Sequence, residues 1–388
     1  MSTPSPATAQ PASPAYEIQT ITSTEAIAEL APDWRRATRG TYHDAPFFQP
    51  EWCAATATSF FPGSAPNILT VRSSGELVGV LPLLRSRGLR RGVPLRTLRS
   101  ISSPHSCRSD LIVGAAPRAE VARAAWSALR QDPWWQAIAI DDVPEDGALH
   151  SLLELAKADS CLTAKWRSRL SPTLAVDPSA PFALCPKRYK SFRNRLKGKL
   201  QRLSEKGTVE FKVESSPTAE TLDRFFALEG AGWKGARHSA VASCESTLRF
   251  YQETWGAAAA LGYARVYTLL LAGKPIAMHL GLCMSGIYCT PKVAYDENYR
   301  DYSLGHLLMQ HAIQDLPNVG AHRFDFLGPN ALWKSVWSTT LQRHDTCYVF
   351  RPTLAGRAAH AGLTQIAMRM RAVRHRLKGD PQDPESWQ

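Results

Sequence analysis

The chain has 388 residues, 44% of them apolar, and a formal net charge of +12 at pH 7. This length exceeds what one hydrophobic core normally needs and suits two, and the apolar content is that of a globular protein. The sequence has neither a run of about 20 apolar residues nor a basic start followed by an apolar block. These absences exclude a membrane span and a secretory signal, so we expect a cytoplasmic protein.

Four segments are expected along the chain. Residues 1–16 are nearly all Ser, Thr, Pro, Ala and Gln without charge, a composition that predicts a disordered tail. A first lobe is expected over residues 17–180 and a second over residues 181–352. A basic amphipathic helix and tail are expected over residues 353–388.

Two similar hairpins favour this two-lobed organisation. Residues 71–83 and residues 269–281 both run from an apolar strand through a glycine turn into a second apolar strand. A duplicated α/β unit accounts for the similarity, since solenoid repeats are far shorter. The alternative is that any two β-hairpins look alike.

The second lobe has the most regular pattern of strands and helices. Apolar runs predict strands, apolar residues three and four apart predict helices, and Ala272-Gly273-Lys274-Pro275 predicts a tight turn. In chain order we expect a strand at 209–213, helices at 218–233 and 246–261, strands at 264–271, 276–283 and 287–293, a helix from residue 304, and strands at 323–327 and 346–351.

A small-residue turn stands between the strand at 287–293 and the helix from residue 304. Free backbone N–H groups at such a helix start bind anions such as phosphate. An ordinary helix cap is the alternative interpretation. The turn has the form Arg300-x-x-Ser303-x-Gly305, and the residues expected to hold an anion are Arg300, Ser303, Leu304, Gly305 and His306.

This turn resembles the R/Q-x-x-G-x-G/A loop with which GNAT acyltransferases hold the pyrophosphate of acyl-coenzyme A, with Ser303 in place of the middle glycine. The order of elements around it also resembles a GNAT domain. Further motifs resemble the CelD-like proteins associated with bacterial cellulose and exopolysaccharide loci, which are distantly related to Fem-type aminoacyl transferases. The resemblance extends over residues 25–352, and its motifs are Pro46-Phe47-Phe48-Gln49-Pro50-Glu51-Trp52, Phe250-Tyr251, Gly273-Lys274-Pro275-Ile276-Ala277, Tyr295-Asp296-x-x-Tyr299, Phe324-Asp325-Phe326-Leu327-Gly328 and Trp333-Lys334.

The resemblance implies an α/β fold with a mixed sheet and two GNAT-like lobes in tandem. The first lobe is expected to be degenerate, because its glycines at 88 and 92 are not followed by an apolar helix. The implied activity is transfer of an acyl group, expected to be acetyl, to an amine of a sugar or small metabolite in polysaccharide or cell-envelope synthesis. The implied co-substrate is acyl-CoA (acetyl-CoA).

Acylation of an amine needs a base, since an alkyl ammonium has a pKa of about 10.4. Asp325 is the leading candidate, because apolar neighbours on its strand would make its carboxylate a better proton acceptor. The alternative is a structural carboxylate paired with Lys334 or a backbone N–H. His279 is the second candidate, with a satisfied core histidine as the alternative, and Tyr288 is a candidate acid for the departing thiolate.

Four side chains of the second lobe and one of the first are expected at the acceptor groove. Lys334, flanked by Trp333, would anchor a carboxylate or phosphate. Trp233 and Lys234 would shape the groove at the end of a helix. Asp110 ends a polar loop of the first lobe that is expected to reach the cleft.

Positive charge gathers in three stretches and predicts an anionic partner. Residues 187–206 hold nine Lys or Arg against one Glu on an amphipathic helix, residues 85–99 hold six Arg, and residues 363–378 form a second basic helix. The excess suggests tRNA, an acidic polysaccharide or an anionic membrane surface, including peripheral attachment to the inner membrane. Two alternative functions therefore stay open: a Fem-like transferase that takes an aminoacyl group from tRNA, and a non-catalytic module that binds nucleic acid or glycan.

Eight cysteines are scattered without a C-x-x-C pair, and the eleven histidines form no ligand pattern. We therefore predict free thiols and no metal. Cys289, on the strand before the turn, is weighed as a nucleophile, but packing is the preferred interpretation.

Overall fold

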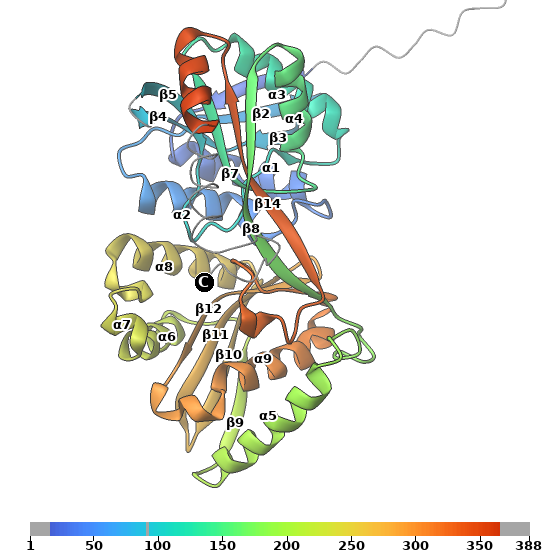
Figure 1. The fold of residues 1–388 in the computed structure, drawn as a ribbon, viewed down its shortest axis with the longest axis vertical. Coiled ribbons are helices and arrows are strands. Elements are labelled where there is room, and N and C mark those ends of the chain that lie inside the picture. The colour runs from blue at the N-terminus through green and yellow to red at the C-terminus, as the bar shows by residue number, and fades with distance from the viewer. Residues whose placement is uncertain (1–15, 91–92, 365–388) are drawn as a thin grey trace, which may run out of the picture.

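The computed structural model describes residues 16–90 and 93–364. It has two lobes, one above the other in Figure 1, and it belongs to the mixed α/β class that the sequence predicted. The first lobe contains β1 (Tyr16–Ile21), α1 (Glu25–Thr38), α2 (Pro50–Phe60), β2 (Ile68–Ser73), β3 (Glu76–Leu81), β4 (Leu83–Arg90), β5 (Val93–Ser100), β6 (Ile112–Val113), α3 (Arg118–Gln131), β7 (Ala137–Pro144), α4 (Leu149–Ala158) and β8 (Leu162–Ala175). The rest of the chain supplies α5 (Tyr189–Ser204), β9 (Val209–Glu214), α6 (Ala219–Ala231), α7 (Trp233–Ala236), α8 (Glu245–Ala260), β10 (Ala264–Leu271), β11 (Lys274–Met284), β12 (Ile287–Tyr295), α9 (Leu304–Asp315), β13 (Arg323–Asp325) and β14 (Thr340–Phe350).

One sheet of ten strands runs through both lobes. Its order is β4-β5-β7-β14-β8-β13-β12-β11-β10-β9, while β1, β2, β3 and β6 form a second sheet. The long strands β8 and β14 cross the waist between the lobes (Figure 1) and pair antiparallel, from Thr340 opposite Thr173 to Phe350 opposite Leu162. The lobes are therefore joined by backbone hydrogen bonding across the waist.

The final strand lies elsewhere than the sequence suggested. We expected the strand at 346–351 to close the second lobe, but β14 lies between β7 and β8 in the first-lobe part of the sheet. β8 in turn extends toward the second lobe, where its end pairs with β13. The expectation was wrong because this exchange pairs strands far apart in the chain, and no local pattern specifies such a pairing.

The two similar hairpins both form, as β2–β3 and as β10–β11. Each turn places two successive residues in the left-handed region: Ser74 (φ 50°) and Gly75 (φ 82°) in one, Ala272 (φ 48°) and Gly273 (φ 76°) in the other. Two residues with positive φ define a type I′ turn, whose twist matches that of the flanking strands, and this explains the glycines. The two stretches thus share a turn geometry, as any pair of tight hairpins of this type does.

Side chains of both lobes meet in one aromatic cluster. Trp52 of α2 is 1% exposed and contacts Phe250 of α8 edge to face, with 5.3 Å between ring centroids. The Tyr263 hydroxyl donates to the Glu51 carboxylate across the same interface at 3.0 Å. Burial of a large apolar side chain contributes about 1.5–3 kcal/mol, so this cluster holds the lobes in one arrangement.

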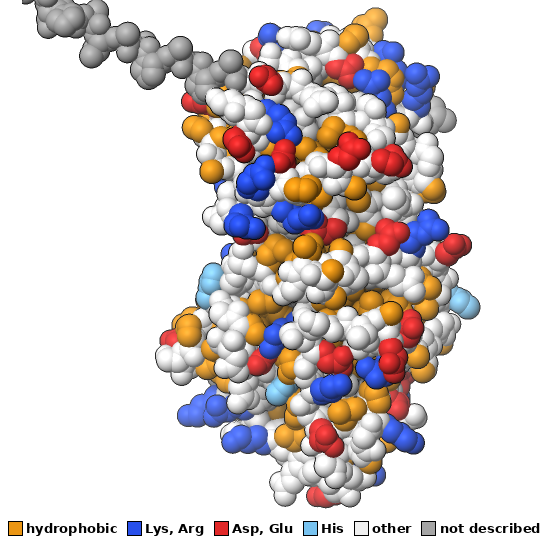
Figure 2. Space-filling view, turned by 180° about the vertical axis from the view of Figure 1, so that it is seen from behind, with side chains coloured by type: hydrophobic (Ala, Val, Ile, Leu, Met, Phe, Trp, Pro, Cys, Tyr) orange, Lys and Arg blue, Asp and Glu red, His pale blue; other side chains and the backbone are white. Residues whose placement is uncertain are grey.

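Helices cover both faces of the second-lobe part of the sheet. α5 and α9 pack on one face, and α6 and α8 pack on the other. α5 is the basic helix predicted over residues 187–206, and it buries Leu196 and Leu203 while most of its cations are exposed. Seen from behind, Lys and Arg side chains gather at one flank of the lower lobe and at an upper corner of the molecule (Figure 2).

Two predicted segments fall largely outside the described residues. The tail predicted over residues 1–16 lies there, except for Tyr16, which begins β1. Residues 354–364 are helical, but the basic part of the predicted C-terminal helix lies beyond them, outside the described range. Within the described ranges, no helix is both long and apolar enough to cross a membrane.

Candidate functional site

β12 changes from a central strand to a free edge in the middle of its length. It pairs in parallel with β13 only over its first three residues, as far as Cys289. Its pairing with β11 shifts register just after this point, where Thr290 and Pro291 together stand opposite Gly281. Such a bulge tolerates a proline, which lacks the N–H that a paired strand donates. The bulge and the divergence from β13 open the sheet here.

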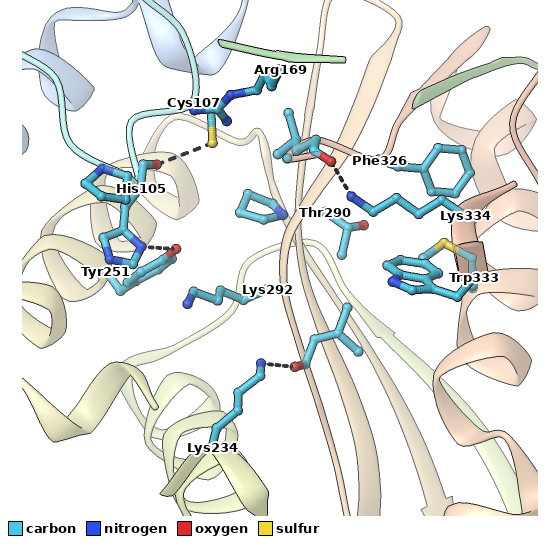
Figure 3. A pocket seen from close by; sticks show the side chains of 16 residues that line it. His105, Cys107, Arg169, Lys234, Tyr251, Thr290, Lys292, Phe326, Trp333 and Lys334 are labelled. Atoms are coloured by element: carbon cyan, nitrogen blue, oxygen red, sulfur yellow. Dashed lines mark hydrogen bonds between the residues drawn. The ribbon is translucent and has the colours of Figure 1, made fainter. Parts of the chain in front are cut away.

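A pocket of about 380 Å³ lies at this opening (Figure 3). Its walls come from both lobes: β12, α8 and the segment after β13 from one, and β8 and the loop before β6 from the other. The first-lobe loop that was expected to reach the cleft does so. The lining residues are Pro104, His105, Cys107, Arg169, Lys234, Tyr251, Thr290, Pro291, Lys292, Val293, Met309, Phe326, Leu327, Gly328, Trp333 and Lys334.

The predicted turn before α9 is present. A short 3-10 helix at Glu297–Tyr302 leads to Ser303 in the left-handed region (φ 54°, ψ 47°), and α9 begins at Leu304. The Ser303 carbonyl accepts from the His306 N–H at 2.9 Å. The N–H groups of Leu304 and Gly305 therefore stand at a helix start without an intrahelical acceptor, and the Ser303 side chain does not cap them.

This helix start fits a phosphate or pyrophosphate. Free N–H groups and the positive end of the helix dipole favour an anion. The Lys199 ammonium of α5 donates to the Ser303 hydroxyl at 2.6 Å and adds positive charge, and Arg300 is exposed on the turn before it. A Cβ added at Gly305 would meet only the Val293 Cγ1 atom, at 3.9 Å. Because Val293 also lines the pocket, the helix start and the pocket adjoin.

The side chain of His306 does not act as a cation at this turn. Its Nδ1 accepts from the Trp337 indole N–H at 3.1 Å, and its ring packs edge to face on Phe192. Burial, with a smaller effect of Lys199, lowers the pKa of His306 to about 4, so the ring is neutral near pH 7. Its backbone N–H is occupied by the Ser303 carbonyl. The Nδ1 atom and the backbone N–H of His306 are thus both engaged within the protein, and its part in holding a phosphate stays a prediction.

Four cationic side chains line the pocket, while no Asp or Glu among the described residues does. Two of these cations have carboxylate partners. The Lys234 ammonium pairs with Glu229 at 2.7 Å and donates to the Val293 carbonyl at 2.8 Å. The Arg169 guanidinium pairs with Asp142 through two nitrogens, with 2.9 Å from Nε to Oδ1.

Lys334, predicted as a substrate anchor, lines the pocket beside Trp333. Its ammonium donates to the carbonyls of Leu327 and Pro329, the latter at 3.0 Å, and lies 5.4 Å from the Trp333 ring centroid. Burial lowers the pKa of Lys334 to about 8. Its direct partners are thus two carbonyls, and it makes no ion pair with Asp325 in the described structure.

His105 and Tyr251 form a pair on the opposite wall (Figure 3). The His105 Nδ1 lies 3.4 Å from the Tyr251 hydroxyl, and its ring stacks on Phe60. Burial, followed by the nearby Lys292 ammonium, lowers the pKa of His105 to about 4, so the ring is neutral near pH 7. Burial raises the pKa of Tyr251 well above its usual value, so its hydroxyl keeps its proton. The pocket therefore offers a proton acceptor and a proton donor side by side.

Asp325, the leading candidate base, is not among the residues that line the pocket. It is 1% exposed, and its carboxylate pairs with the Arg108 guanidinium of the first lobe. Its Oδ1 also accepts from the Leu327 N–H at 2.9 Å. The observed partners fit a structural carboxylate, and its role as the base stays a prediction.

His279 and Tyr288 are also absent from the pocket lining. His279 is fully buried, and neither ring nitrogen has a hydrogen-bond partner among the described residues. Burial lowers the pKa of His279 to about 3, and the nearby His306 lowers it by a smaller amount. The Gly305 backbone raises this pKa, although it makes no hydrogen bond to the ring. The Tyr288 hydroxyl is likewise buried without a partner, and its ring contacts Phe324. Both side chains are core residues in this structure.

The remaining predicted site residues are Trp233, Lys234 and Asp110, and only one of the described side chains among them lines the pocket. Lys234 lines the pocket, while the side chain of Trp233 lies outside what the structure describes. Asp110 does not line it. The Asp110 carboxylate, 2% exposed, accepts from the N–H groups of Ala148 and Leu149 at 2.9 and 2.8 Å. Its place is therefore the start of α4, away from the pocket lining.

Sequence reasoning missed three residues at or beside the pocket. Lys292 is a charge directly after a proline in an otherwise apolar strand, and that pattern was an available signal. His105 belongs to the polar loop that was expected to reach the cleft, but no feature distinguished it from its neighbours. Arg108, the partner of Asp325, had no signal, because an ion pair across 217 positions leaves no mark on either local sequence.

Comparison with known proteins agrees with this geometry. Residues 190–335 match the family model described as "Acetyltransferase (GNAT) domain", so the second lobe is similar in sequence to acetyltransferase domains of the GNAT type. No curated protein matches the chain significantly. Within the described residues, no cluster of His, Cys, Asp or Glu is arranged to hold a metal ion.

Three solved structures share the fold at low sequence identity. A FemX crystal structure has 15% identity and a TM-score of 0.55 and covers 85% of this chain and 96% of its own. The C-terminal domain of a putative lysylphosphatidylglycerol synthetase from Agrobacterium fabrum has 13% identity and a TM-score of 0.52, covering 91% and 97%. A conserved protein of unknown function from Bacteroides thetaiotaomicron has 11% identity and a TM-score of 0.54, covering 86% and 100%. These likenesses extend over both lobes, and the narrower CelD-like resemblance stays a prediction.

Proposed function

We propose that the chain transfers an acyl group, expected to be acetyl, from acyl-coenzyme A to an amine of a sugar or small metabolite bound in the pocket. The observation that carries the proposal is that the open helix start of α9 adjoins the pocket at the gap between β12 and β13. Val293 belongs to both places, since it faces Gly305 and lines the pocket. A carrier whose pyrophosphate binds Leu304, Gly305 and Lys199 therefore has direct access to the acceptor pocket.

The pocket residues meet the needs of amine acylation. The carbon–nitrogen bond forms as the carbon–sulfur bond breaks, so the amine loses a proton and the departing sulfur gains one. His105, neutral near pH 7, passes the amine's proton on to solvent water, because its lowered pKa makes it a weak proton acceptor, and the Tyr251 hydroxyl is the donor beside it. Lys334, which lines the pocket beside Trp333, is the cation that would stabilise the oxygen on which negative charge develops. Asp325 is retained as the alternative base.

A melting-temperature experiment tests this function. Acetyl-coenzyme A, coenzyme A and a tRNA mixture are added separately to the wild-type chain and to Gly305→Trp and Gly256→Trp. Both glycines are helical and have open space at the Cβ position, but Gly256 lies on the exposed side of α8, so it is the matched control. A ligand at 100 times its dissociation constant adds about 2.7 kcal/mol, or a few degrees. We expect both coenzymes to stabilise the wild type and Gly256→Trp but not Gly305→Trp.

A Fem-like transfer from aminoacyl-tRNA is the second candidate, and α5 favours it. In the described structure none of the α5 cations is ion-paired with a carboxylate, and Lys199 joins this helix to the α9 start. A polyanion would extend from that start along α5. Stabilisation by tRNA alone, weakening steeply with salt, would favour this candidate. No response to any of the three ligands would instead favour a non-catalytic module for nucleic acid or glycan.

The CelD-like motifs support a setting in surface-polysaccharide assembly. Under this proposal the acceptor is an amino sugar or a related precursor, and a soluble or peripherally membrane-bound enzyme would meet it at the cytoplasmic side. Vesicles with anionic lipid test the peripheral attachment, since a basic helix such as α5 binds them in a salt-dependent way. Equal binding to neutral vesicles would contradict it.

A further inference from the structure

The pocket carries more positive charge than its own walls neutralise. Lys234 and Arg169 have the carboxylate partners Glu229 and Asp142. Lys334 is held by two backbone carbonyls. Lys292 differs from these three, because it makes no hydrogen bond or ion pair with any described residue. Its ammonium lies 5.4 Å from the Tyr251 ring centroid, which is its one direct contact of this kind.

Burial makes this arrangement costly. The Lys292 side chain is partly buried in the pocket wall, and its desolvation lowers its pKa, which Lys234 lowers further and Glu229 opposes. A buried cation without a hydrogen-bonded counter-charge is destabilising. A ligand that brings a negative group beside Lys292 removes that cost, so the unfilled partner position favours an anion.

Side chains along β12 point alternately to the two sides of the sheet, and this determines on which side the anion would lie. Successive strand residues face opposite sides of a sheet. Lys292 stands opposite Leu280, which packs in the cluster with α6 and α8, whereas Val293 stands opposite His279 and faces the α9 side. Figure 3 shows the Lys292 side chain directed toward Tyr251 and away from Trp333. Lys292 is therefore on the opposite side of β12 from the α9 helix start.

We propose that the acceptor carries an anionic group, a phosphate or carboxylate, in addition to its amine, and that Lys292 binds this group. The inference rests on the proposed function, since it specifies the acceptor of the same pocket. The carrier enters from the α9 side, the anionic end of the acceptor lies on the Tyr251 side, and the amine lies between them at the opening of the sheet. The phosphate of an amino sugar, or an amino acid, has this chemistry, whereas an amine without an acidic group lacks it.

The first test measures anion binding without requiring the natural acceptor. Inorganic phosphate and glucosamine 6-phosphate are titrated by thermal shift against the wild type, Lys292→Met, Lys292→Arg and Lys274→Met. Lys274 is an exposed lysine in the β10–β11 turn, so its variant controls for the loss of one positive charge. To remove phosphate binding at the α9 start, the same series is repeated with Gly305→Trp in every chain.

We expect Lys292→Met to weaken glucosamine 6-phosphate binding about tenfold or more, Lys292→Arg to keep most of it, and Lys274→Met to match the wild type. Glucosamine, without the phosphate, should bind weakly to all four chains. Equal affinity of the wild type and Lys292→Met, or no phosphate-dependent binding by the wild type, would overturn the proposal.

Acetyl-coenzyme A, titrated in parallel, separates this inference from the proposed function. Binding of acetyl-coenzyme A to both the wild type and Lys292→Met, without Lys292-dependent anion binding, would leave the acyltransferase standing and refute the anionic acceptor. Lys292-dependent anion binding without any acetyl-coenzyme A binding would support the anion site and refute the carrier.

Discussion

The starts of two helices, α4 in the first lobe and α9 in the second, both favour an anion, but their surroundings differ. At α4 the Asp110 carboxylate accepts from the N–H of Ala148, just before the helix, at 2.9 Å and from the N–H of its first residue, Leu149, at 2.8 Å, and it lies 2.9 Å from the His43 ring. At α9 no described carboxylate takes that position, and Lys199 adds a cation beside it.

A helix start favours an anion, and the two sites differ in whether a side chain of the protein supplies it. In the first lobe the anion is internal, buried and fully bonded, so the feature stabilises the fold. In the second lobe no described residue supplies a carboxylate at this position, and the site adjoins a pocket.

Removing Asp110 should have the largest effect on stability. Asp110→Ala leaves the three buried N–H groups of Leu111, Ala148 and Leu149 and the His43 ring without their partner, and we expect a loss of about 3–5 kcal/mol in the free energy of unfolding. Urea denaturation measures it. Asp301→Asn, at an exposed position just before α9, is the matched control and should change stability by less than about 0.5 kcal/mol. Similar losses in both variants would show that the α4 cap is not special.

The two buried histidines extend the comparison. His43 is bonded to Asp110, while His279, under the start of α9, has no partner among the described residues. The pKa of His279 is about 3 in the folded state and about 6.5 when unfolded, so the unfolded chain binds more protons between these values and stability falls as pH decreases below 6.5. His279→Met should reduce that fall by about 1.3 kcal/mol in total between pH 7.0 and pH 5.5. Denaturation at pH 7.0 and 5.5 measures it, and identical slopes for both chains would contradict the assignment.

The variant Lys199→Met tests whether the cation at the start of α9 contributes to the binding of acetyl-coenzyme A. Its ammonium donates to Ser303 at 2.6 Å, and charge-assisted contacts to phosphate are among the stronger hydrogen bonds. We expect Lys199→Met to weaken acetyl-coenzyme A binding about tenfold, as measured by calorimetric titration. Lys274→Met should leave the affinity unchanged, and an unchanged affinity for Lys199→Met would remove Lys199 from the site.

Much of the second lobe was predictable from local patterns. The strand at 264–271 was placed at its observed bounds, and the turn before α9 was recognised because it combines a strand, small residues and an apolar helix. The pairing of β14 with β7 and β8 was not predictable, since it depends on contacts between distant segments.

Only those site residues that stand in a recognisable local motif were predictable from the sequence. Lys234, Trp333 and Lys334, predicted at the acceptor groove, line the pocket, and their contact with a substrate stays a prediction. Asp325 and His279 were predicted as catalytic because each is a polar residue in an apolar strand. Whether such a residue faces a pocket or is buried depends on how helices and the other lobe cover the sheet, which the local sequence does not specify. The partner of Asp325 comes from the other lobe, and only the folded chain brings the two together.

Calorimetric titration of acetyl-coenzyme A into the wild type, Gly305→Trp and Gly256→Trp tests the central claim most directly. We expect binding of equal affinity to the wild type and Gly256→Trp, and at least about a hundredfold weaker binding to Gly305→Trp, because the indole fills the space above the free N–H groups of α9. Equal affinity of all three chains, or no binding to the wild type, would contradict the claim that the start of α9 holds the carrier.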